Sequence, residues 1–270
     1  MKIGITGYSG FVGRELLEFP NTYPISGDVK DQKEIESYIL SLHPDIIIHL
    51  AAKSNVDYCE LPANEHEVRQ VNVHGTFNVA SAGYKINCPV ILLSTDHVFS
   101  GMWGNYKENN TPKPVNFYGL SKLAAETLQE AFPNLKIVRT SHLFSNNYHF
   151  ANEMSGLVRG EVQEYALFMS RSFMWVTHFA KALMEYVHRI DVMPSILHIS
   201  GAQSISHFAF MKAVAETFGI SSKLVMPRIK EISGHAPRPY LAGLNVSMSR
   251  KLGISQFDYL DGLRKMEPLG

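Results

Sequence analysis

The chain has 270 residues, 45% of them hydrophobic, and its 25 basic and 25 acidic residues give a formal net charge of zero. This length and composition allow a sizeable buried core, as one large domain or two small ones. The balanced charge, without a block of lysines and arginines, argues against nucleic acid or an anionic membrane as a partner.

Targeting and redox signals predict a cytoplasmic location. An apolar strand begins almost at the start of the chain, so we expect no signal peptide. No apolar run reaches the roughly 18 residues that span a bilayer. Cys59 and Cys88 lie apart without the spacing of metal ligands. We interpret them as unpaired thiols of a reducing compartment.

The first predicted element, a strand over residues 3–6, runs into a glycine-rich turn. Gly7, Gly10 and Gly13 are spaced three apart, which lets the chain turn sharply, approach a phosphate and start a helix. Free N–H groups at the positive end of that helix can bind a dinucleotide pyrophosphate. The spacing differs from G-x-G-x-x-G, and such a triplet can be only a turn. Its place straight after a strand favours a cofactor site, with the pyrophosphate over residues 10–12.

Strands and helices alternate along the first half of the chain. Apolar runs predict buried parallel strands, and amphipathic patterns predict the helices between them. The predicted strands are residues 3–6, 45–50, 90–94 and 136–140, with 23–26 as a candidate second strand, and the predicted helices are residues 12–19, 31–42, 63–85 and 118–131. This alternation implies an α/β fold with a doubly wound, Rossmann-type parallel sheet.

After residue 140 the pattern changes. Residues 145–165 are polar and are predicted to be irregular, and prolines interrupt the tail. Helices are predicted over residues 176–189 and 207–218, with a short strand over 196–200. We therefore expect a cofactor-binding domain over residues 1–142 and a small, mainly substrate-binding lobe over 143–270, from which residues 176–202 return to the sheet.

A second signature suits proton transfer beside a nicotinamide. Tyr118 and Lys122 are four residues apart, so a helix places the phenol and the ammonium on one face. Hydride addition to a ketone creates an alkoxide, and an acid must supply the proton. The ammonium can lower the pKa of the phenol, ordinarily about 10, and Thr95 at a strand end can orient the substrate oxygen. The alternative is a helix start with a solvated lysine.

These residues resemble the extended short-chain dehydrogenases/reductases. That superfamily combines a T-G-x-x-G-F-x-G turn, a strand ending in Ala-Ala, a Ser or Thr at a later strand end, and Y-x-x-x-K. The chain supplies Thr6-Gly7-x-x-Gly10-Phe11-x-Gly13, Leu50-Ala51-Ala52, Ser94-Thr95 and Tyr118-x-x-x-Lys122. The resemblance implies NAD(P)-dependent redox chemistry on a carbonyl or alcohol.

Within that superfamily the chain resembles most the dTDP-4-dehydrorhamnose reductase family, over essentially its whole length. The matching segments are Val56-Asp57-x-Cys59-Glu60, Val71-Asn72, Ser94-Thr95-Asp96-His97-Val98-Phe99-Ser100-Gly101, Tyr106-x-Glu108, Pro112-x-Pro114, Asn116-x-Tyr118-Gly119-x-Ser121-Lys122, Arg139-Thr140-Ser141 and Arg238-Pro239. His97 departs from the family, which has Tyr there. The resemblance implies NAD(P)H-dependent reduction of a 4-keto-6-deoxy sugar nucleotide, with dTDP-4-dehydrorhamnose to dTDP-rhamnose as the leading case.

The resemblance also implies where the ligands bind. The catalytic residues would be Thr95, Tyr118 and Lys122, with Tyr118 as the proton donor. The residues implied for NADP(H) or NAD(H) are Gly7, Ser9, Gly10, Phe11, Val12, Arg14, Asp28, Val29, Ala51, Ala52, Lys53, Tyr118 and Lys122. The residues implied for the substrate are Thr95, Asp96, Val98, Tyr118, Asn146, Asn147 and Trp175.

Related activities differ in the residues that they need. A sugar-nucleotide 4,6-dehydratase resembling this fold carries an Asp-Glu pair after the strand-end Thr, but here Asp96 is followed by His97. The fucose-route epimerase/reductases use a Cys and a His where this chain has Asp96 and Trp175. A UDP-galactose-type 4-epimerase uses the same Thr, Tyr and Lys and stays open. So does a non-catalytic, NADP-binding subunit like the regulatory β-subunit of methionine adenosyltransferase, which resembles the same branch.

The choice between NAD(H) and NADP(H) is also open. Residues 18–28 are too few to show the side chain that normally contacts the ribose 2′ position, and Arg14 either reaches a 2′-phosphate or is a solvated helix residue. The 12 histidines show no ligand spacing, so we expect no metal site. A nucleotide sugar is the expected partner. The oligomeric state, a homodimer included, is not fixed by the sequence.

Overall fold

A six-stranded parallel sheet forms the centre of the molecule. The computed structural model describes residues 1–146, 148–230 and 234–266. The strand order is β10-β5-β4-β3-β1-β2, with β1 Ile3–Thr6, β2 Thr22–Pro24, β3 Ile46–His49, β4 Val90–Thr95, β5 Leu135–Thr140 and β10 Ile196–His198. The predicted Rossmann-type fold is confirmed. The chain leaves β1 on one side to form β2 and returns on the other to form β3, and such a switch point is where open α/β sheets bind ligands.

Both faces of the sheet are buried, which explains the nearly continuous apolar runs. Successive side chains of a strand point to opposite faces. Ile46 and Ile48 of β3 therefore enter one core together with Ile5 of β1. Ile47, between them, enters a second core with Val90 of β4. Each strand needs apolar residues at odd and even positions alike, as is typical of parallel sheets.

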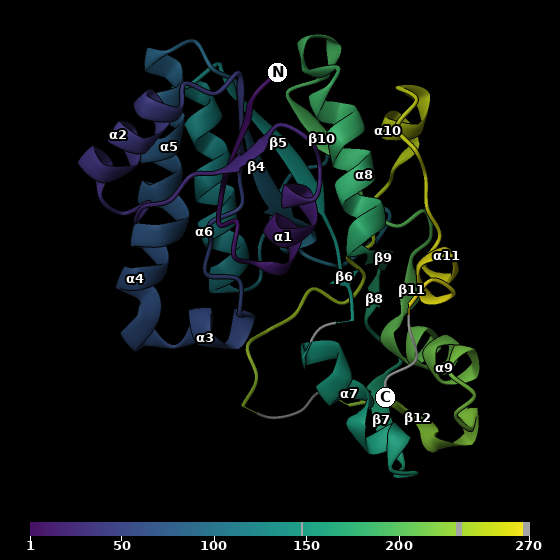
Figure 1. Ribbon diagram of the computed structural model, residues 1–270. Helices are drawn as coiled ribbons and strands as arrows, with labels where there is room; N and C mark the ends of the chain where they lie inside the picture. Colours follow the sequence, from purple (N-terminus) through teal and green to yellow (C-terminus); the bar gives the residue numbers. More distant parts are fainter. Residues whose placement is uncertain (147, 231–233, 267–270) are drawn as a thin grey trace.

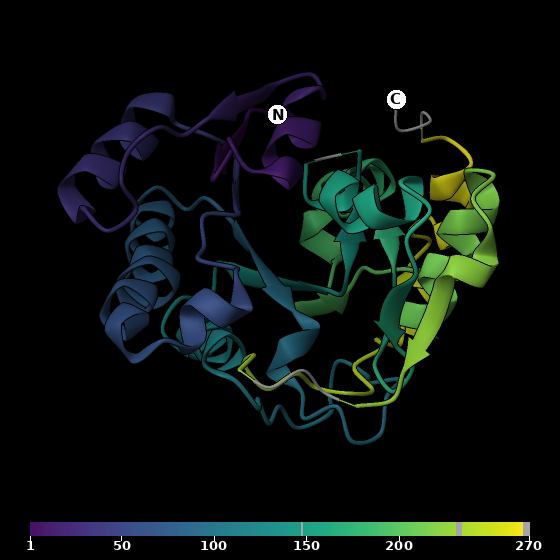
Figure 2. The ribbon, with the colours of Figure 1, turned by 90° about the horizontal axis from the view of Figure 1, so that it is seen from below.

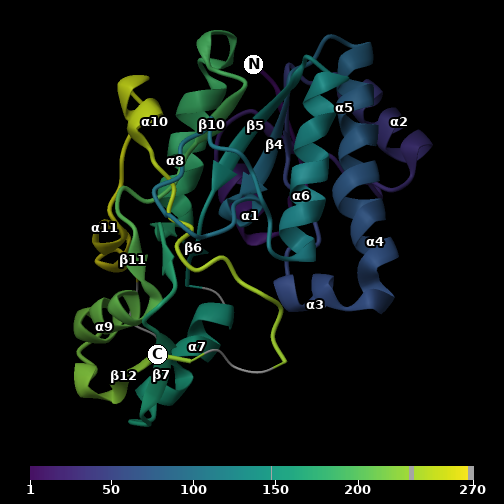
Figure 3. The ribbon, with the colours of Figure 1, turned by 180° about the vertical axis from the view of Figure 1, so that it is seen from behind.

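Helices cover both faces of the sheet (Figures 1 and 3). The helices on one face are α1 Phe11–Leu17 and α8 Val176–Val187. Those on the other face are α2 Gln32–Leu42, α4 Glu65–Arg69, α5 Gly75–Lys85 and α6 Phe117–Thr127. The shorter connecting elements are α3 Val56–Glu60, η1 Pro62–Asn64, η3 Asp96–Val98, η4 Leu128–Glu130 and η5 Ile190–Val192. Among the described residues, no helix combines the length and hydropathy that crossing a bilayer requires.

A π-helical turn interrupts the helix predicted over residues 63–85. This turn, η2 Gln70–His74, lies between α4 and α5. Its Asn72 is fully buried, and the side-chain amide bonds the backbone N–H of Lys53 at 2.7 Å and its carbonyl at 3.0 Å. The same amide donates to Ser121 Oγ at 2.8 Å. Asn72 thus ties three segments together: the long helix, α6 and the chain that follows β3.

The lobe is assembled from short elements. Residues 145–165, predicted to be irregular, contain α7 Tyr148–Val158 and β7 Gln163–Ala166, so that prediction is wrong. Phe150, Met154 and Leu157 lie at helical spacing and are buried in the core of the lobe, but the polar residues between them hid this stripe. The other elements are β6 Leu143–Phe144, β8 Ser170–Arg171, β9 Met174–Trp175, β11 Ile205–Ser206, α9 His207–Thr217, η6 Ser222–Leu224, β12 Val225–Arg228, α10 Ser247–Lys251 and α11 Tyr259–Leu263.

A segment near the C-terminus runs back from the lobe toward the sheet domain. Residues 234–246, called the strap below, come after the lobe strand β12 and run below the sheet domain in Figure 1; Figure 2 shows the same segment from below. The N–H of Leu241 donates to the carbonyl of Gly101 at 2.8 Å. Arg238 lies 2.9 Å from the carboxylate of Asp57 in α3. The strap therefore links the lobe to loops at the carboxyl end of the sheet.

Candidate active site

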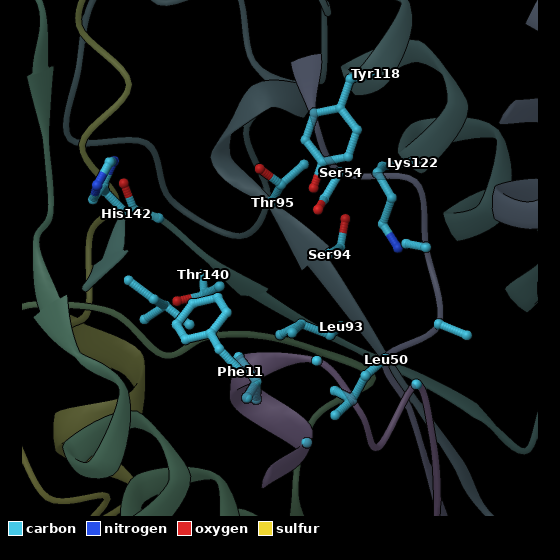
Figure 4. A pocket seen from close by; sticks show the side chains of 18 of the residues that line it. Phe11, Leu50, Ser54, Leu93, Ser94, Thr95, Tyr118, Lys122, Thr140 and His142 are labelled. Atoms are coloured by element: carbon cyan, nitrogen blue, oxygen red, sulfur yellow. The ribbon is translucent and has the colours of Figure 1, made fainter. Parts of the chain in front are cut away.

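A cavity of about 510 Å³ opens at the carboxyl ends of the sheet strands. Its walls come from the chain after β1, β3, β4 and β5 and from the start of α6, as Figure 4 shows. Of the residues predicted from the sequence, those that line it are Gly7, Ser9, Gly10, Phe11, Val12, Ala51, Ala52, Thr95, Tyr118 and Lys122. The glycine turn and the Tyr-Lys pair therefore meet in one cavity.

The glycine turn shapes one end of this cavity. Gly7 has a φ of +65°, and a Cβ there would lie 2.5 Å from the backbone nitrogen of Ala51. Only glycine allows that close approach of β1 to the chain after β3. Gly10 is the N-cap of α1 and supplies no side-chain cap. The first N–H groups of the helix are therefore open to an anion in the cavity.

Thr95, Tyr118 and Lys122 lie at the opposite end of the cavity (Figure 4). Thr95 ends β4, while Tyr118 and Lys122 lie in the first two turns of α6. The helix starts here because the Asn116 side chain accepts from the N–H of Gly119 at 2.8 Å. A Cβ at Gly119 would lie 2.1 Å from a backbone oxygen of η3, so glycine allows α6 to approach the end of β4. This close packing brings the phenol next to the Thr95 hydroxyl.

Burial shifts the pKa values of the phenol and the ammonium in opposite directions. It raises the pKa of Tyr118, and the negative charge of Asp96 raises it further, against the opposing effect of the Thr95 hydroxyl. It lowers the pKa of Lys122 to about 8, partly offset by the charge of Glu126. Both shifts follow from the cost of holding a charge away from water. At neutral pH the phenol keeps its proton, as a general acid must.

The structure places several residues predicted for the substrate outside the cavity lining. Asp96 and Val98 are buried, and Val98 belongs to a small apolar core under the loop of residues 99–106. Trp175 packs edge to face on His178. Asn146 is exposed and does not line the cavity, and Asn147 lies outside the described residues. The residues after β5 that line the cavity are Ser141, His142 and Leu143. They come before the lobe residues that were predicted for the substrate.

Four of the residues predicted for the cofactor, Arg14, Asp28, Val29 and Lys53, do not line this cavity. Arg14 donates through Nε to the carbonyl of Ser9 at 2.9 Å and does not line the cavity. Asp28 lies on a neighbouring surface hollow, and Val29 is buried. The Nζ of Lys53 pairs with Glu67 at 2.8 Å. Asn72 fixes the backbone of Lys53, and the residues on either side of it, Ala52 and Ser54, line the cavity.

Sequence reasoning did not assign the residues that follow β5 to the site. Ser141 and His142 line the cavity together with Ser54, which follows β3. The predicted parallel sheet could have indicated them, because the carboxyl ends of all parallel strands meet at one edge of the sheet. His142 is open to the cavity, and burial of the surrounding site lowers its pKa to about 4. Its imidazole is therefore neutral at pH 7 and can contact a ligand in the cavity.

A second cavity of about 330 Å³ lies between the lobe and the strap. It is lined by Phe168, Met169, His207, Arg228, His235, Ala236, Pro237 and Arg238. The ring of His207 lies 6.4 Å from that of His142 in the first cavity. The lining has two guanidinium groups and no carboxylate, which suits an anion such as a diphosphate. In the described part of the chain, no group of His, Cys, Asp and Glu is arranged to hold a metal ion.

The chain is similar to a family of known proteins along nearly its whole length. The family model described as the RmlD substrate binding domain matches residues 1–267. A dTDP-4-dehydrorhamnose reductase of Mycobacterium tuberculosis is 28% identical over 87% of this chain and 77% of its own length. Methionine adenosyltransferase 2 subunit beta of Xenopus tropicalis is 25% identical over 93% of this chain and 82% of its own.

A solved structure shows the same fold. The crystal structure of a dTDP-4-dehydrorhamnose reductase from Bacillus anthracis in complex with NADP superposes with a TM-score of 0.89. It is 27% identical in sequence, and the match covers 98% of this chain and 99% of that one.

Proposed function

This chain belongs to the family described as the RmlD substrate binding domain, and we propose that it is an NAD(P)H-dependent reductase of a 4-keto-6-deoxy sugar nucleotide. The leading substrate is dTDP-4-dehydrorhamnose, reduced to dTDP-rhamnose. One observation carries the proposal: Thr95, Tyr118 and Lys122 lie in the same cavity as the glycine turn. Relatives of 27–28% identity named as this reductase, one of them solved with NADP, support it.

The cavity fits a dinucleotide cofactor. The glycine cradle at Gly7 leaves room that a Cβ would fill, and the start of α1 supplies unpaired N–H groups for a pyrophosphate. Leu50 and Leu93 supply apolar walls between the two ends. When bound, NAD(P)H supplies a hydride. Lys122 would hold the ribose hydroxyls next to the nicotinamide, at the end of the cavity where Tyr118 lies.

The proton comes from the chain itself. Tyr118 donates it to the substrate oxygen as that oxygen gains negative charge. Lys122 is four residues away on the same helix face and stabilises the phenolate that remains. Thr95 keeps the phenol and the substrate oxygen in line. The raised pKa of Tyr118 keeps the phenol protonated at neutral pH, which is the form that can donate a proton.

The second cavity supports a nucleotide-linked sugar over a small ketone. Arg228 and Arg238 can bind the two phosphates there, and Phe168 supplies an apolar contact for a base. His142 and His207 lie between the two cavities. A sugar held near Thr95 and Tyr118 would then be joined to a diphosphate in the second cavity.

A panel of 4-keto sugar nucleotides tests the proposal. Nicotinamide absorbance is followed with NADPH and with NADH, and a Tyr118→Phe variant reports turnover that does not depend on the site. Stoichiometric loss of NAD(P)H with at least one panel member is the expected result. Interconversion of 4-epimers without net loss of NAD(P)H would instead favour an epimerase.

The second candidate is a non-catalytic, NADP-binding regulatory subunit. The similarity to methionine adenosyltransferase 2 subunit beta favours it, since that protein matches 93% of this chain. In that case no panel member would be turned over, and the protein would bind a methionine adenosyltransferase catalytic chain tightly. Turnover of any panel member would reject the non-catalytic function.

A further inference from the structure

A buried carboxylate lies directly behind Thr95, outside the cavity. Asp96 is 2% exposed. Thr95 Oγ1 donates to its Oδ1 at 3.1 Å, and Ser141 Oγ donates to its Oδ2 at 2.6 Å. Arg171 Nε lies 3.4 Å from Oδ2. Asp96 thus collects contacts from three parts of the molecule: the end of β4, the end of β5 and the lobe strand β8.

These contacts determine how the Thr95 hydroxyl is used. A hydroxyl has one proton to donate and two lone pairs to accept with. The proton of Thr95 goes to Asp96, and one lone pair accepts from the N–H of His97 at 3.2 Å. A hydrogen bond from the Thr95 hydroxyl to the phenolate would lower the pKa of Tyr118. With its proton on Asp96, the Thr95 hydroxyl does not stabilise the phenolate in this way.

We propose that Asp96, held in place by Ser141 and Arg171, is a positioning residue that fixes the direction of the Thr95 hydroxyl. It thereby keeps the Tyr118 proton on the phenol until the substrate oxygen takes it. This inference rests on the proposed reductase function. It gives Asp96 a role through Thr95 in place of the substrate contact predicted from the sequence.

Arg171 anchors this carboxylate to the lobe. Its guanidinium is buried, and Nη1 donates to the carbonyls of Ser170 at 2.9 Å and Tyr240 at 3.3 Å. Ser141 Oγ accepts from the N–H of Ser172, the next residue after Arg171, at 3.2 Å. The lobe and the strap therefore set the position of Asp96.

The charge of Asp96 acts on several neighbours, which the test must take into account. The charged and titratable groups around Asp96 are Arg171, Arg238, His97, His142 and His198, and those around Tyr118 besides Asp96 are Cys59 and Lys122. Burial keeps His97 and His198 neutral near pH 7, with pKa values of about 4 and about 3. Lys122, with a pKa of about 8, loses its charge at alkaline pH in wild type and variants alike.

A split between kcat and KM separates positioning from mere structural support. Asp96→Asn keeps the shape and removes the charge that receives the Thr95 proton, so kcat at pH 7 should fall by roughly tenfold or more, with the substrate KM within about twofold of wild type. The alkaline limb of kcat should stay in place, because it follows Lys122, whose pKa of about 8 lies far below the raised pKa of Tyr118. Arg171→Gln keeps the carboxylate, so its kcat should fall less. Affinity for NADPH should stay within about twofold in both variants, since neither residue lines the cavity.

Two further variants keep the test decisive. Ser141→Ala removes one hydrogen bond without changing charge, so it should lower kcat with the pH limb in place, even if Asp96→Asn fails to fold. Asp57→Asn breaks a different carboxylate–arginine pair, 2.9 Å long, and should lower the melting temperature without lowering kcat. A wild-type kcat in both Ser141→Ala and Asp96→Asn would overturn the positioning role of Asp96 and leave the proposed function standing. A wild-type protein that reduces no keto sugar would overturn the proposed function and this role together.

Discussion

Burial prepares Tyr118 and Lys122 for different tasks. It raises the pKa of the phenol and lowers that of the ammonium to about 8, although the two groups lie one helical turn apart. The phenol is therefore protonated throughout the physiological range. The ammonium is charged at neutral pH and titrates just above it.

Replacing Tyr118 by Phe should remove the proton donor and little else. Turnover should fall by about 10²–10⁴, while affinity for NADPH, measured by fluorescence quenching, stays nearly unchanged. Tyr186→Phe is a matched control, since Tyr186 is buried in α8 and bonds the carbonyl of Pro194, away from the cavity. It should cost some stability and leave turnover intact. A Tyr118→Phe variant with near-normal turnover would move the proton donor elsewhere.

Affinity for the cofactor should depend on pH through Lys122. Its pKa of about 8 means that the ammonium loses its charge as the pH rises through that value. The dissociation constant of NADPH should therefore increase between about pH 7 and pH 9. In Lys122→Met the constant should be higher at neutral pH and flat over the same range. An equally steep rise in Lys122→Met would exclude Lys122 as the source.

The sequence could predict which residues belong to this site where a motif fixes both the residue type and its position. Thr95, Tyr118 and Lys122 belong to such motifs, and all three line one cavity. Asp96 is adjacent to Thr95 in sequence, yet the chain enters η3 there and turns the carboxylate inward to Arg171. No local pattern predicts that turn, because its partner comes from β8, far along the chain.

At the scale of elements, the apolar pattern of the sequence predicted the strands and helices of the central sheet. The parallel strands and their helices were readable because each buries its own apolar pattern. The pieces of the lobe were not, because strands such as β8 and β11 contribute two residues each and pair across long stretches of chain. The π-turn around Asn72 was equally hidden, since its side-chain partners come from elsewhere in the fold.

Asn72→Ala should therefore affect the site as well as stability. It leaves the backbone of Lys53 and the Ser121 hydroxyl without their buried partner, at a cost of about 2 kcal/mol or more. Affinity for NADPH should fall too, because Ala52 and Ser54, on either side of Lys53, line the cavity. Asn134→Ala is the control, since the side-chain amide of Asn134 donates to the backbone carbonyl of Cys88 at the opposite end of the sheet. Calorimetry and cofactor titration on both variants separate the two effects, and equal NADPH affinity in both would contradict the link to the site.

At the scale of the whole molecule, the two cavities are framed by different parts of the chain. Strands and α1 frame the first cavity, whereas lobe residues and the strap frame the second. The strap carries Arg238 and Ala236, and both hold Asp57 of α3, the latter through its backbone N–H at 2.8 Å. Cofactor binding should thus depend mainly on the sheet domain. Substrate binding should depend on how the lobe and strap are held against it.

Gly10→Asp tests whether the cofactor binds to the sheet domain. The substitution should preserve or raise the stability of the ligand-free protein and should weaken the binding of NADPH. Gly10 is the N-cap of α1 with φ −69° and ψ 167°, and no side chain caps the helix. An aspartate there can cap the free N–H groups, so the protein without ligand should be as stable as wild type or more stable, by up to about 1 kcal/mol. The same carboxylate would occupy and repel the pyrophosphate. NADPH at 100 times its Kd should stabilise the wild type by about 2.7 kcal/mol and this variant hardly at all. Gly10→Ala, without charge or cap, should keep a weaker response. A full NADPH-induced rise in melting temperature in Gly10→Asp would mean that the pyrophosphate does not bind at the start of α1.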